Sequence, residues 1–323
     1  MKITVTGASG LLGSSVARAL VASGHGVTTL QRRPSGVDGA RDVIGTVTDP
    51  TAVAEAINGA EAIVHLAAKV SLTGDPREFA AVNVGGTRTL VNGAQAAGVP
   101  RLVHISSPSV AHTGESIVGS GAGLASPGLA RGEYARTKAA GELIALSADS
   151  ENLRVLALRP HLMWGPGDVQ LTERIVERAR AGRMPVLGAG TALVDTLFVD
   201  NAVEAIVAAL DAVDTTHGES LVVTNGQPRP IGELMARIAI AGGAPEPKLR
   251  IPVRAALTAG SVVEKVWDLG EHDDEPPLTR FLAEQLSTAH WFDQRRTQEV
   301  LDWRPRVSIE EGLELLVAHY SAN

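Results

Sequence analysis

Strand-like and helix-like segments alternate along the first 160 residues, and this alternation restricts the possible folds more than any other feature. Each short segment rich in β-branched residues leads through Gly, Asn or Asp into a segment with apolar residues at steps of three and four. Such repeats form a parallel sheet with helices on both faces. The pattern therefore predicts an α/β fold with a doubly wound parallel sheet. The predicted strands are residues 2–6, 26–30, 42–44, 62–66, 101–106 and 154–158, and the predicted helices are 12–23, 50–58 and 79–97.

The alternation weakens after Arg159-Pro160. We therefore predict a dinucleotide-type sheet domain over residues 1–160 and a smaller, mostly helical substrate-binding region over 161–323. Residues 191–225 are the exception, because their pattern predicts a return to the sheet of the first domain. The strand-like pieces of this stretch are 196–199 and 221–224, and its amphipathic helix is 201–210.

Composition excludes several classes of function. Of 323 residues, 44% are hydrophobic and 20% are charged, as in a globular chain, and no apolar run is long enough to cross a bilayer. The net charge of -7, without a basic block, argues against a nucleic-acid partner. The absence of cysteine excludes disulfides, thiolate metal sites and cysteine nucleophiles. The N-terminus lacks the apolar core of a signal peptide, so we expect a cytoplasmic protein.

Glycines recur at intervals of three residues where the first strand gives way to the first helix, in Thr6-Gly-Ala-Ser-Gly-Leu-Leu-Gly13. Glycine permits positive φ and close backbone approach, and the free N–H groups and dipole of a helix N-terminus favour negative charge. A purely structural turn is the alternative. The strand before and the helix after favour a cradle for the pyrophosphate of a dinucleotide. The predicted cofactor contacts are Gly7, Ser9, Gly10, Leu11, Leu12 and Gly13.

Two arginines follow the second predicted strand. Enzymes that bind NAD often carry an Asp or Glu here for the ribose 2′-hydroxyl, whereas this chain has Gln31-Arg32-Arg33. Guanidinium groups suit a 2′-phosphate better. We therefore predict that Arg32 and Arg33 bind NADP(H) in preference to NAD(H). The alternative is that both are ordinary surface residues.

A tyrosine, a lysine and a serine form the candidate catalytic group. Tyr134 and Lys138 are four residues apart and share one face of a predicted helix. The ammonium is expected to stabilise the phenolate and lower the pKa of Tyr134, which makes this phenol a proton donor. Ser107 follows strand 101–106, at the edge where open α/β sheets bind ligands, and would hold a substrate carbonyl oxygen. Alternatively, a Tyr and a Lys at this spacing simply face solvent.

Taken in order, these segments resemble the extended short-chain dehydrogenases of the NAD-dependent epimerase/dehydratase superfamily. The resemblance spans essentially the whole chain. It rests on the glycine turn, His65-Leu-Ala-Ala68, Asn83-Val-Gly-Gly-Thr87, Ser106-Ser107, Tyr134-Ala-Arg-Thr-Lys138 and Arg159-Pro160.

The resemblance implies a Rossmann-type fold and assigns the catalytic roles to Ser107, Tyr134 and Lys138, with Lys138 also holding the nicotinamide ribose. Asn83 would lie near the active site. The chain departs from many relatives at Gln31 and at Thr46, where they carry an Asp near the adenine. The residues implied to line the cofactor are Leu66, Ala67, Ala68 and Pro160.

Further segments narrow the resemblance. Sugar-nucleotide members of the superfamily carry an Arg where this chain has Val194, which argues against a sugar-nucleotide substrate. Segments 164–168, 195–201 and 307–313 resemble the 3β-hydroxysteroid dehydrogenase/isomerase branch. Within that branch, segments 107–112, 159–164 and 276–287 are most similar to bacterial 2-alkyl-3-oxoalkanoate reductases of olefin biosynthesis.

Residues 251–269 are rich in Ala, Leu and Val and include Trp267. Such a helix would roof an acyl tunnel or touch a membrane surface, or else lie buried in the core of the second region. The acidic stretch 271–275, followed by Pro276-Pro277, predicts a solvated loop. No His/Asp/Glu spacing suggests a metal site. The histidines predicted to be structural are His112, His161 and His290.

We therefore predict an NADPH-dependent ketone reductase that converts a hydrophobic 2-alkyl-3-oxoalkanoate to its 3-hydroxy acid. A 3β-hydroxysteroid dehydrogenase is the rival enzyme. A non-catalytic NADP(H)-binding sensor is the rival of another class, although such proteins commonly lack the Tyr or Lys kept here. By resemblance we also expect a homodimer. The apolar segment 251–269 adds a membrane surface as a further expected partner, together with pathway enzymes.

Overall fold

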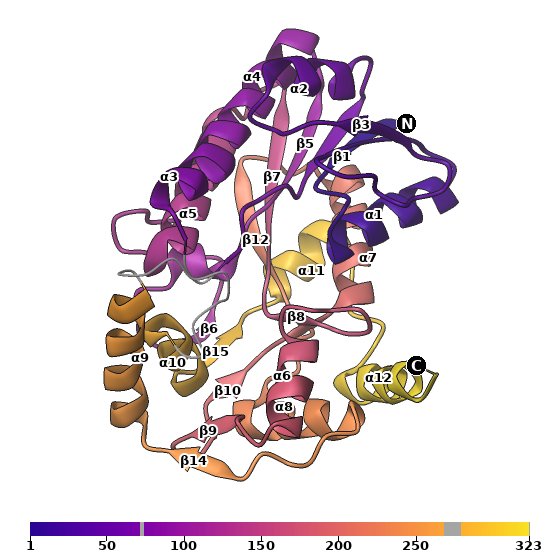
Figure 1. The fold of residues 1–323 in the computed structure, drawn as a ribbon. Helices are drawn as coiled ribbons and strands as arrows, with labels where there is room; N and C mark the ends of the chain where they lie inside the picture. The colour runs from indigo at the N-terminus through magenta and orange to yellow at the C-terminus, as the bar shows by residue number, and fades with distance from the viewer. Residues whose placement is uncertain (72–73, 268–278, 323) are drawn as a thin grey trace.

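The computed structural model describes residues 1–71, 74–267 and 279–322, and it has the predicted α/β architecture (Figure 1). Its centre is a parallel seven-stranded sheet in the order β12-β7-β5-β4-β1-β2-β3. This order, in which the chain reverses direction between β1 and β4, is that of a Rossmann sheet, so the predicted fold class is confirmed. The strands are β1 (Lys2–Thr6), β2 (Gly26–Gln31), β3 (Arg41–Ile44), β4 (Ala62–His65), β5 (Arg101–Ile105), β7 (Arg154–Pro160) and β12 (Glu219–Val223).

Helices cover both faces of the sheet (Figure 1). On one face, α1 (Leu11–Ala22) packs against α7 (Val199–Ala212), which in turn contacts α11 (Arg295–Leu301). On the other face, α2 (Pro50–Ile57), α4 (Thr87–Ala97) and α5 (Gly132–Ser147) pack side by side. Each layer encloses its own apolar core against the sheet. The inner strands β4, β5 and β7 are therefore buried on both sides, as their continuous apolar sequences predict, whereas the edge strand β3 is mostly exposed.

The single helix predicted at 79–97 is instead built from three pieces. A short α3 (Pro76–Phe79) leads into a π-helix, η1 (Ala80–Gly86), and then into α4. Within η1 the side chain of Asn83 reaches out of the helix to residue 69 and to Thr137 on α5. A π-helical turn of this kind is common at functional sites.

The stretch predicted to return to the sheet does so through β12, which extends it beyond β7, and through α7, which covers it. The strand-like residues 196–199 behave differently. There β11 (Leu197–Phe198) pairs with β8 (Met163–Trp164) in a separate two-stranded sheet.

The second region lies against the end of the sheet where β7 runs on into β8 (Figure 1). Its core contains the edge-to-face pair of Trp164 and Phe198, with ring centroids 5.3 Å apart. The remaining elements are η2 (Pro108–Ala111), β6 (Ile117–Ser120), α6 (Thr172–Arg180), β9 (Pro185–Leu187), β10 (Leu193–Val194), β13 (Arg229–Pro230), α8 (Ile231–Ala241), β14 (Leu249–Ile251), α9 (Val253–Trp267), α10 (Arg280–Ser287), β15 (His290–Phe292) and α12 (Ile309–Ala322).

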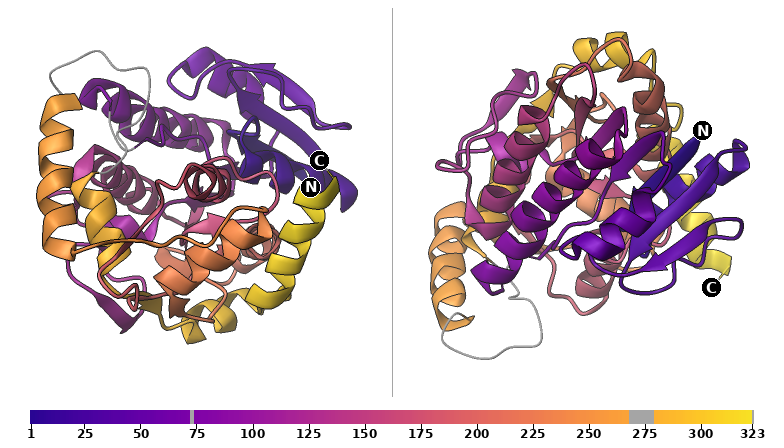
Figure 2. Two further views of the ribbon diagram at one scale, coloured as in Figure 1. Left: turned by 60° about the horizontal axis from the view of Figure 1, so that its bottom comes forward. Right: turned by 90° about the horizontal axis from the view of Figure 1, so that it is seen from above.

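The apolar helix α9 stands at the edge of the molecule and packs on α10 (Figure 2). Ala256 is fully buried, whereas Val262 and Val266 are more than half exposed. One face of α9 thus packs in a small apolar core with Leu187 and Ala283, and the helix is not buried all round. Three predicted features lie outside the described residues. They are the end of the apolar segment 251–269, the acidic loop 271–275 with Pro276-Pro277, and the first residues of segment 276–287. No helix among those described is both long and apolar enough to span a bilayer.

A buried ion pair ties the catalytic helix α5 to the sheet. Arg159 at the end of β7 donates to both carboxylate oxygens of Glu142 on α5, at 2.9 and 2.5 Å, and the two side chains are 1% and 0% exposed. Ser220 of β12 also donates to Glu142, at 2.8 Å. Although burial opposes its ionisation, the hydrogen bonds and charge of Arg159 hold the pKa of Glu142 below its usual value.

We predict that Arg159→Met lowers the free energy of unfolding by about 3–5 kcal/mol, because it leaves the Glu142 carboxylate buried without its counter-charge. Arg41→Met is the matched control, since Arg41 pairs with Glu55 in solvent and both side chains are more than half exposed. That control should cost less than about 1 kcal/mol. Urea unfolding followed by circular dichroism measures both variants, and equal losses would contradict a specific role for the buried pair.

Candidate active site

Ser107 lies directly beyond β5, at the edge of the sheet where that strand ends. It caps the short helix η2, and its Oγ accepts hydrogen bonds from the backbone N of Ser109 at 3.3 Å and from the Ser109 hydroxyl at 2.9 Å. A further hydrogen bond joins the side chains of Ser107 and Tyr134. Because Ser107 already accepts from Ser109, its own proton is free to be donated.

Tyr134 and Lys138 lie in α5, one turn apart. The ammonium of Lys138 is buried and donates to the backbone carbonyl of Ile105, the last residue of β5, at 2.5 Å. Lys138 thereby fixes α5 against the strand that carries Ser107. The structure brings all three predicted catalytic residues to one place, and the solvated-face alternative does not describe Lys138.

Burial sets the protonation of the group. It raises the pKa of the Tyr134 phenol, opposed by the hydrogen bond from Ser107. The expected lowering of this pKa by Lys138 is therefore wrong for the protein as described, because desolvation of the phenolate dominates and Ser107 is the group that opposes it. Burial also lowers the pKa of Lys138 to about 8, against the opposing charge of Glu142. At neutral pH the site holds a neutral phenol beside a charged ammonium, which suits proton donation to a carbonyl oxygen.

Two histidines border Lys138 on its sheet side. His65 and His104 are buried with ring centroids 5.3 Å apart. Burial is the main cause that lowers the pKa of both rings, and the charge of Lys138 lowers it further. His65 is held by the hydroxyls of Thr6 at 2.8 Å and Thr87 at 3.1 Å. Both rings remain neutral, so Lys138 is the cation of this centre.

The glycine turn has the shape of a phosphate cradle. Gly7 has φ of +78°, and a Cβ there would approach the backbone of Ala67 to 2.9 Å. At Gly13 a Cβ would lie 2.4 Å from the carbonyl oxygen of Gly7. Helix α1 has Gly10 at its N-cap and no side-chain cap, so its first N–H groups are left for an anion. These residues therefore fit the pyrophosphate of a dinucleotide.

The other predicted cofactor residues lie at the same edge of the sheet as this turn. Ala67 donates its backbone N–H to Thr6 at 3.0 Å, which holds segment 66–68 beside the end of β1. Pro160 is buried at the end of β7. Asn83 holds the backbone of Lys69 through two hydrogen bonds of 2.8 and 3.2 Å. Segment 66–68 and Pro160 lie at the ends of parallel strands, where α/β folds bind dinucleotides, whereas Asn83 contacts Lys69 from the π-helix η1.

Arg32 and Arg33 lie in the turn after β2, and both are exposed. Neither makes a hydrogen bond or an ion pair with any other described residue. Gln31, which occupies the usual position of the acidic ribose ligand, is buried and directs its amide to Thr29 and Asp42. The sequence gives no signal for Asp42, because an acidic residue at the start of an edge strand resembles an ordinary surface residue.

The three histidines predicted to be structural lie together, with His112 at the end of the short helix η2. His112 and His290 approach to 3.0 Å between their Nε2 atoms, and His161 donates from Nδ1 to the Asp195 carbonyl at 2.6 Å. Burial lowers the pKa of His161 to about 4 and that of His290 to about 3, so both are neutral. Val194 is buried beside them in β10, opposite Arg229.

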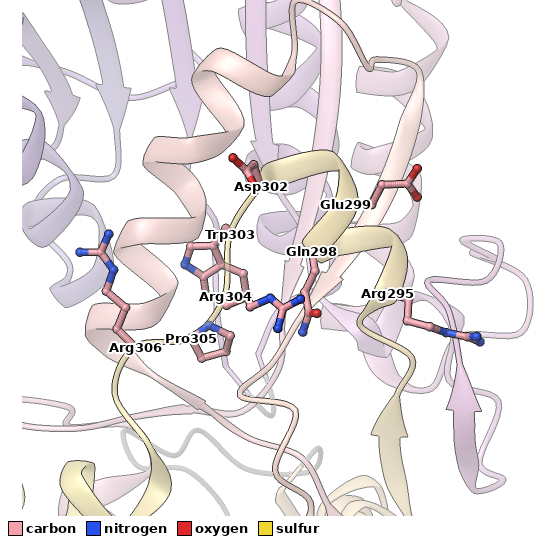
Figure 3. A pocket seen from close by; sticks show the side chains of 8 residues that line it. All are labelled: Arg295, Gln298, Glu299, Asp302, Trp303, Arg304, Pro305 and Arg306. Carbon is pink, nitrogen blue, oxygen red and sulfur yellow. The ribbon is translucent and has the colours of Figure 1, made fainter.

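A separate surface hollow of about 620 Å³ lies beside α11, and Figure 3 shows the side chains that line it. Two of its arginines, Arg295 and Arg306, point in opposite directions (Figure 3). Arg295 pairs with Asp293, and Arg306 pairs with Glu204 at 3.6 Å. None of the predicted site residues lines this hollow.

Comparison with known proteins identifies the family. The model of the NAD dependent epimerase/dehydratase family matches residues 3–224, which include all the catalytic and cofactor residues described above. The chain belongs to this family. Epimerase/dehydratase-family enzymes use a nicotinamide cofactor, and the chain is accordingly an NAD(P)-dependent oxidoreductase.

Two relatives within the epimerase/dehydratase family are similar over most of their length. The chain is 39% identical to a 2-alkyl-3-oxoalkanoate reductase of Stenotrophomonas maltophilia, covering 100% of both proteins. It is 34% identical to a protein of the same name from Shewanella oneidensis, covering 97% of this chain and 85% of the other. The predicted resemblance to this group is thus confirmed, and 3β-hydroxysteroid dehydrogenases are also among the relatives.

Solved structures of epimerase/dehydratase-family enzymes share the fold. A UDP-glucuronic acid 4-epimerase from Bacillus cereus, in complex with NAD, superposes with a TM-score of 0.78 at 19% identity and covers 100% of this chain and 99% of its own. At this identity the likeness establishes the fold alone.

We predict that NADPH affinity falls as the pH rises through about 8, because Lys138 then loses the charge that would hold the nicotinamide ribose. The raised pKa of Tyr134 and the neutral histidines exclude these neighbours as the source of the change. Fluorescence titration with NADPH from pH 6.5 to about 9.5 measures this dependence. Lys138→Met should bind weakly with a flat profile, and an unchanged pH dependence in that variant would contradict the assignment.

Proposed function

We propose that the protein is an NADPH-dependent ketone reductase that converts a hydrophobic 2-alkyl-3-oxoalkanoate to the 3-hydroxy acid. One observation carries the proposal. The Ser107 and Tyr134 hydroxyls meet beside Lys138 in a chain that is similar over its full length to a 2-alkyl-3-oxoalkanoate reductase. The neutral phenol suits reduction, in which a proton must be given to the carbonyl oxygen.

The protein's own groups have distinct roles in the reaction. When bound, the reduced nicotinamide supplies the hydride, which adds to the C3 carbonyl carbon. Ser107 donates a hydrogen bond to the carbonyl oxygen, and Tyr134 transfers its proton to that oxygen as negative charge develops. Lys138 stabilises the phenolate left on Tyr134. The C=O bond becomes CH–OH, and the phenolate is reprotonated before the next turnover.

NADPH is proposed as the preferred cofactor because of the charge after β2. Arg32 and Arg33 are exposed and unpaired within the described part of the chain, and no carboxylate follows β2 directly. Two free guanidinium groups favour a 2′-phosphate over a 2′-hydroxyl.

For the long alkyl chains of the substrate we propose a place along α9 and α10. The exposed Val262 and Val266 on α9 support an apolar contact there. The homodimer, the cytoplasmic location, and contacts with a membrane surface or pathway enzymes stay predictions.

We predict that Tyr134→Phe lowers kcat by about 10²–10⁴, because the variant has no proton to give to the developing alkoxide. The same variant should bind NADPH within about twofold of the original affinity, since the phenyl ring keeps its position and Lys138 its charge. Stopped-flow oxidation of NADPH measures the first effect and fluorescence titration the second. Full activity in Tyr134→Phe would contradict the role of Tyr134, and NADPH binding without any turnover in the unmodified protein would support the alternative of a cofactor-binding sensor.

The substrate is tested by direct competition between the two enzyme functions. Oxidation of a long-chain 2-alkyl-3-hydroxyalkanoate and of a 3β-hydroxysteroid should be compared with NADP⁺ and NAD⁺. We expect kcat/KM to be at least about tenfold higher for the hydroxy acid, a difference of about 1.4 kcal/mol in transition-state binding. Appreciable activity only on the steroid would overturn the proposed substrate, and a preference for NAD⁺ would overturn the proposed cofactor.

A further inference from the structure

The carboxylate of Asp42, on β3, collects hydrogen bonds from the end of the neighbouring strand and the turn beyond it. The Thr29 hydroxyl donates to Oδ1 at 2.5 Å, and the Gln31 amide donates to the same oxygen at 3.2 Å. Ser35 donates twice, from its hydroxyl to Oδ1 at 2.7 Å and from its backbone N to Oδ2 at 3.0 Å. Although partial burial opposes ionisation, these bonds lower the pKa of Asp42, so it is charged at neutral pH.

These contacts fix the turn at both ends. Gln31 precedes the two arginines and Ser35 follows them, with only Arg32, Arg33 and Pro34 between. The Ser35 hydroxyl also accepts from the backbone N of Val37 at 3.2 Å, and Val37 is buried in the core beneath α1. The backbone that carries Arg32 and Arg33 is therefore held to one carboxylate and to the core.

The position of Gln31 adds to this arrangement. Its side chain is 5% exposed and turns toward Asp42 and Thr29, away from solvent. The amide nitrogen of Gln31 is thus used within the protein and its Oε1 is buried without a partner, so the first exposed side chains beyond β2 are the two guanidinium groups. The same end of β2 lies beside the glycine turn, because Thr6 of β1 pairs with Leu30.

We propose that Asp42 is a positioning residue for cofactor selectivity, which holds the turn so that Arg32 and Arg33 face the 2′-phosphate of NADPH. The inference rests on the proposed function, because it requires a phosphate at this place. Asp42 itself does not touch the cofactor.

The negative charge of Asp42 and its hold on the turn have opposite effects on the affinity for a 2′-phosphate, which makes the inference testable. A carboxylate near a phosphate repels it, so removing the charge alone should strengthen binding of a 2′-phosphate. Releasing the turn should instead weaken it, because the guanidinium groups must then be ordered when the ligand binds. The sign of the change in Asp42→Asn separates the two effects.

The experiment compares 2′,5′-ADP with 5′-AMP by isothermal titration calorimetry, since the two differ only in the 2′-phosphate. The unmodified protein should bind 2′,5′-ADP at least about tenfold more tightly. In Asp42→Asn that affinity should fall about fivefold to tenfold, as for the partial loss of a charge-assisted hydrogen bond, while 5′-AMP binding stays within about twofold. Glu55→Gln is the charge-matched control, because Glu55 pairs with Arg41 on the same strand and does not contact the turn.

A second measurement needs no nucleotide. Amide hydrogen exchange of residues 32, 33 and 35–37 should be about tenfold faster in Asp42→Asn and unchanged in Glu55→Gln, because Asp42 accepts from the Ser35 amide. Three results in Asp42→Asn would overturn the role of Asp42 and leave the proposed use of NADPH intact. They are stronger or unchanged binding of 2′,5′-ADP, an equal loss of affinity for 5′-AMP, and an unchanged rate of amide exchange. No preference for 2′,5′-ADP in the unmodified protein would overturn both this role and the proposed use of NADPH.

Discussion

The hydrogen bond from the Lys138 ammonium to the Ile105 carbonyl is the contact on which the rest of the active site depends. It joins the catalytic helix to the end of the strand that carries Ser107, at 2.5 Å and away from solvent. One turn earlier, Tyr134 is thereby brought to the Ser107 hydroxyl. The Arg159–Glu142 pair fixes the same helix one turn later. The site is thus a helix held to a parallel sheet at two successive turns.

Burial of this centre determines which direction of chemistry the resting groups favour. Desolvation disfavours every charge near Ser107, Tyr134 and Lys138. Tyr134 therefore stays protonated, and His65 and His104 stay neutral. The pKa of Lys138 is lowered to about 8, close to neutral pH. A protonated phenol is ready to give its proton to a carbonyl oxygen. The same groups, with the proton movements reversed, serve the oxidation of an alcohol.

The sequence predicts the features that depend on short stretches of chain. The strands and helices of the sheet, the glycine turn and the spacing of Tyr134 and Lys138 are local patterns, and the fold follows from them. Contacts between distant segments are not visible in this way. The π-helix at Asn83, the pairing of β11 with β8 and the role of Asp42 arise from side chains that meet only in the folded protein. The pKa of Tyr134 was predicted in the wrong direction because spacing shows the ammonium but not the desolvation.

The central claim is that this centre reduces the C3 ketone of a long-chain 2-alkyl-3-oxoalkanoate with NADPH. Transfer of deuterium to the product from NADPH that carries deuterium at both C4 positions tests it most directly, with mass spectrometry to locate the label. The account predicts one deuterium at C3 of the 3-hydroxy acid in each turnover. Binding of NADPH and the keto acid without label at C3 would contradict it.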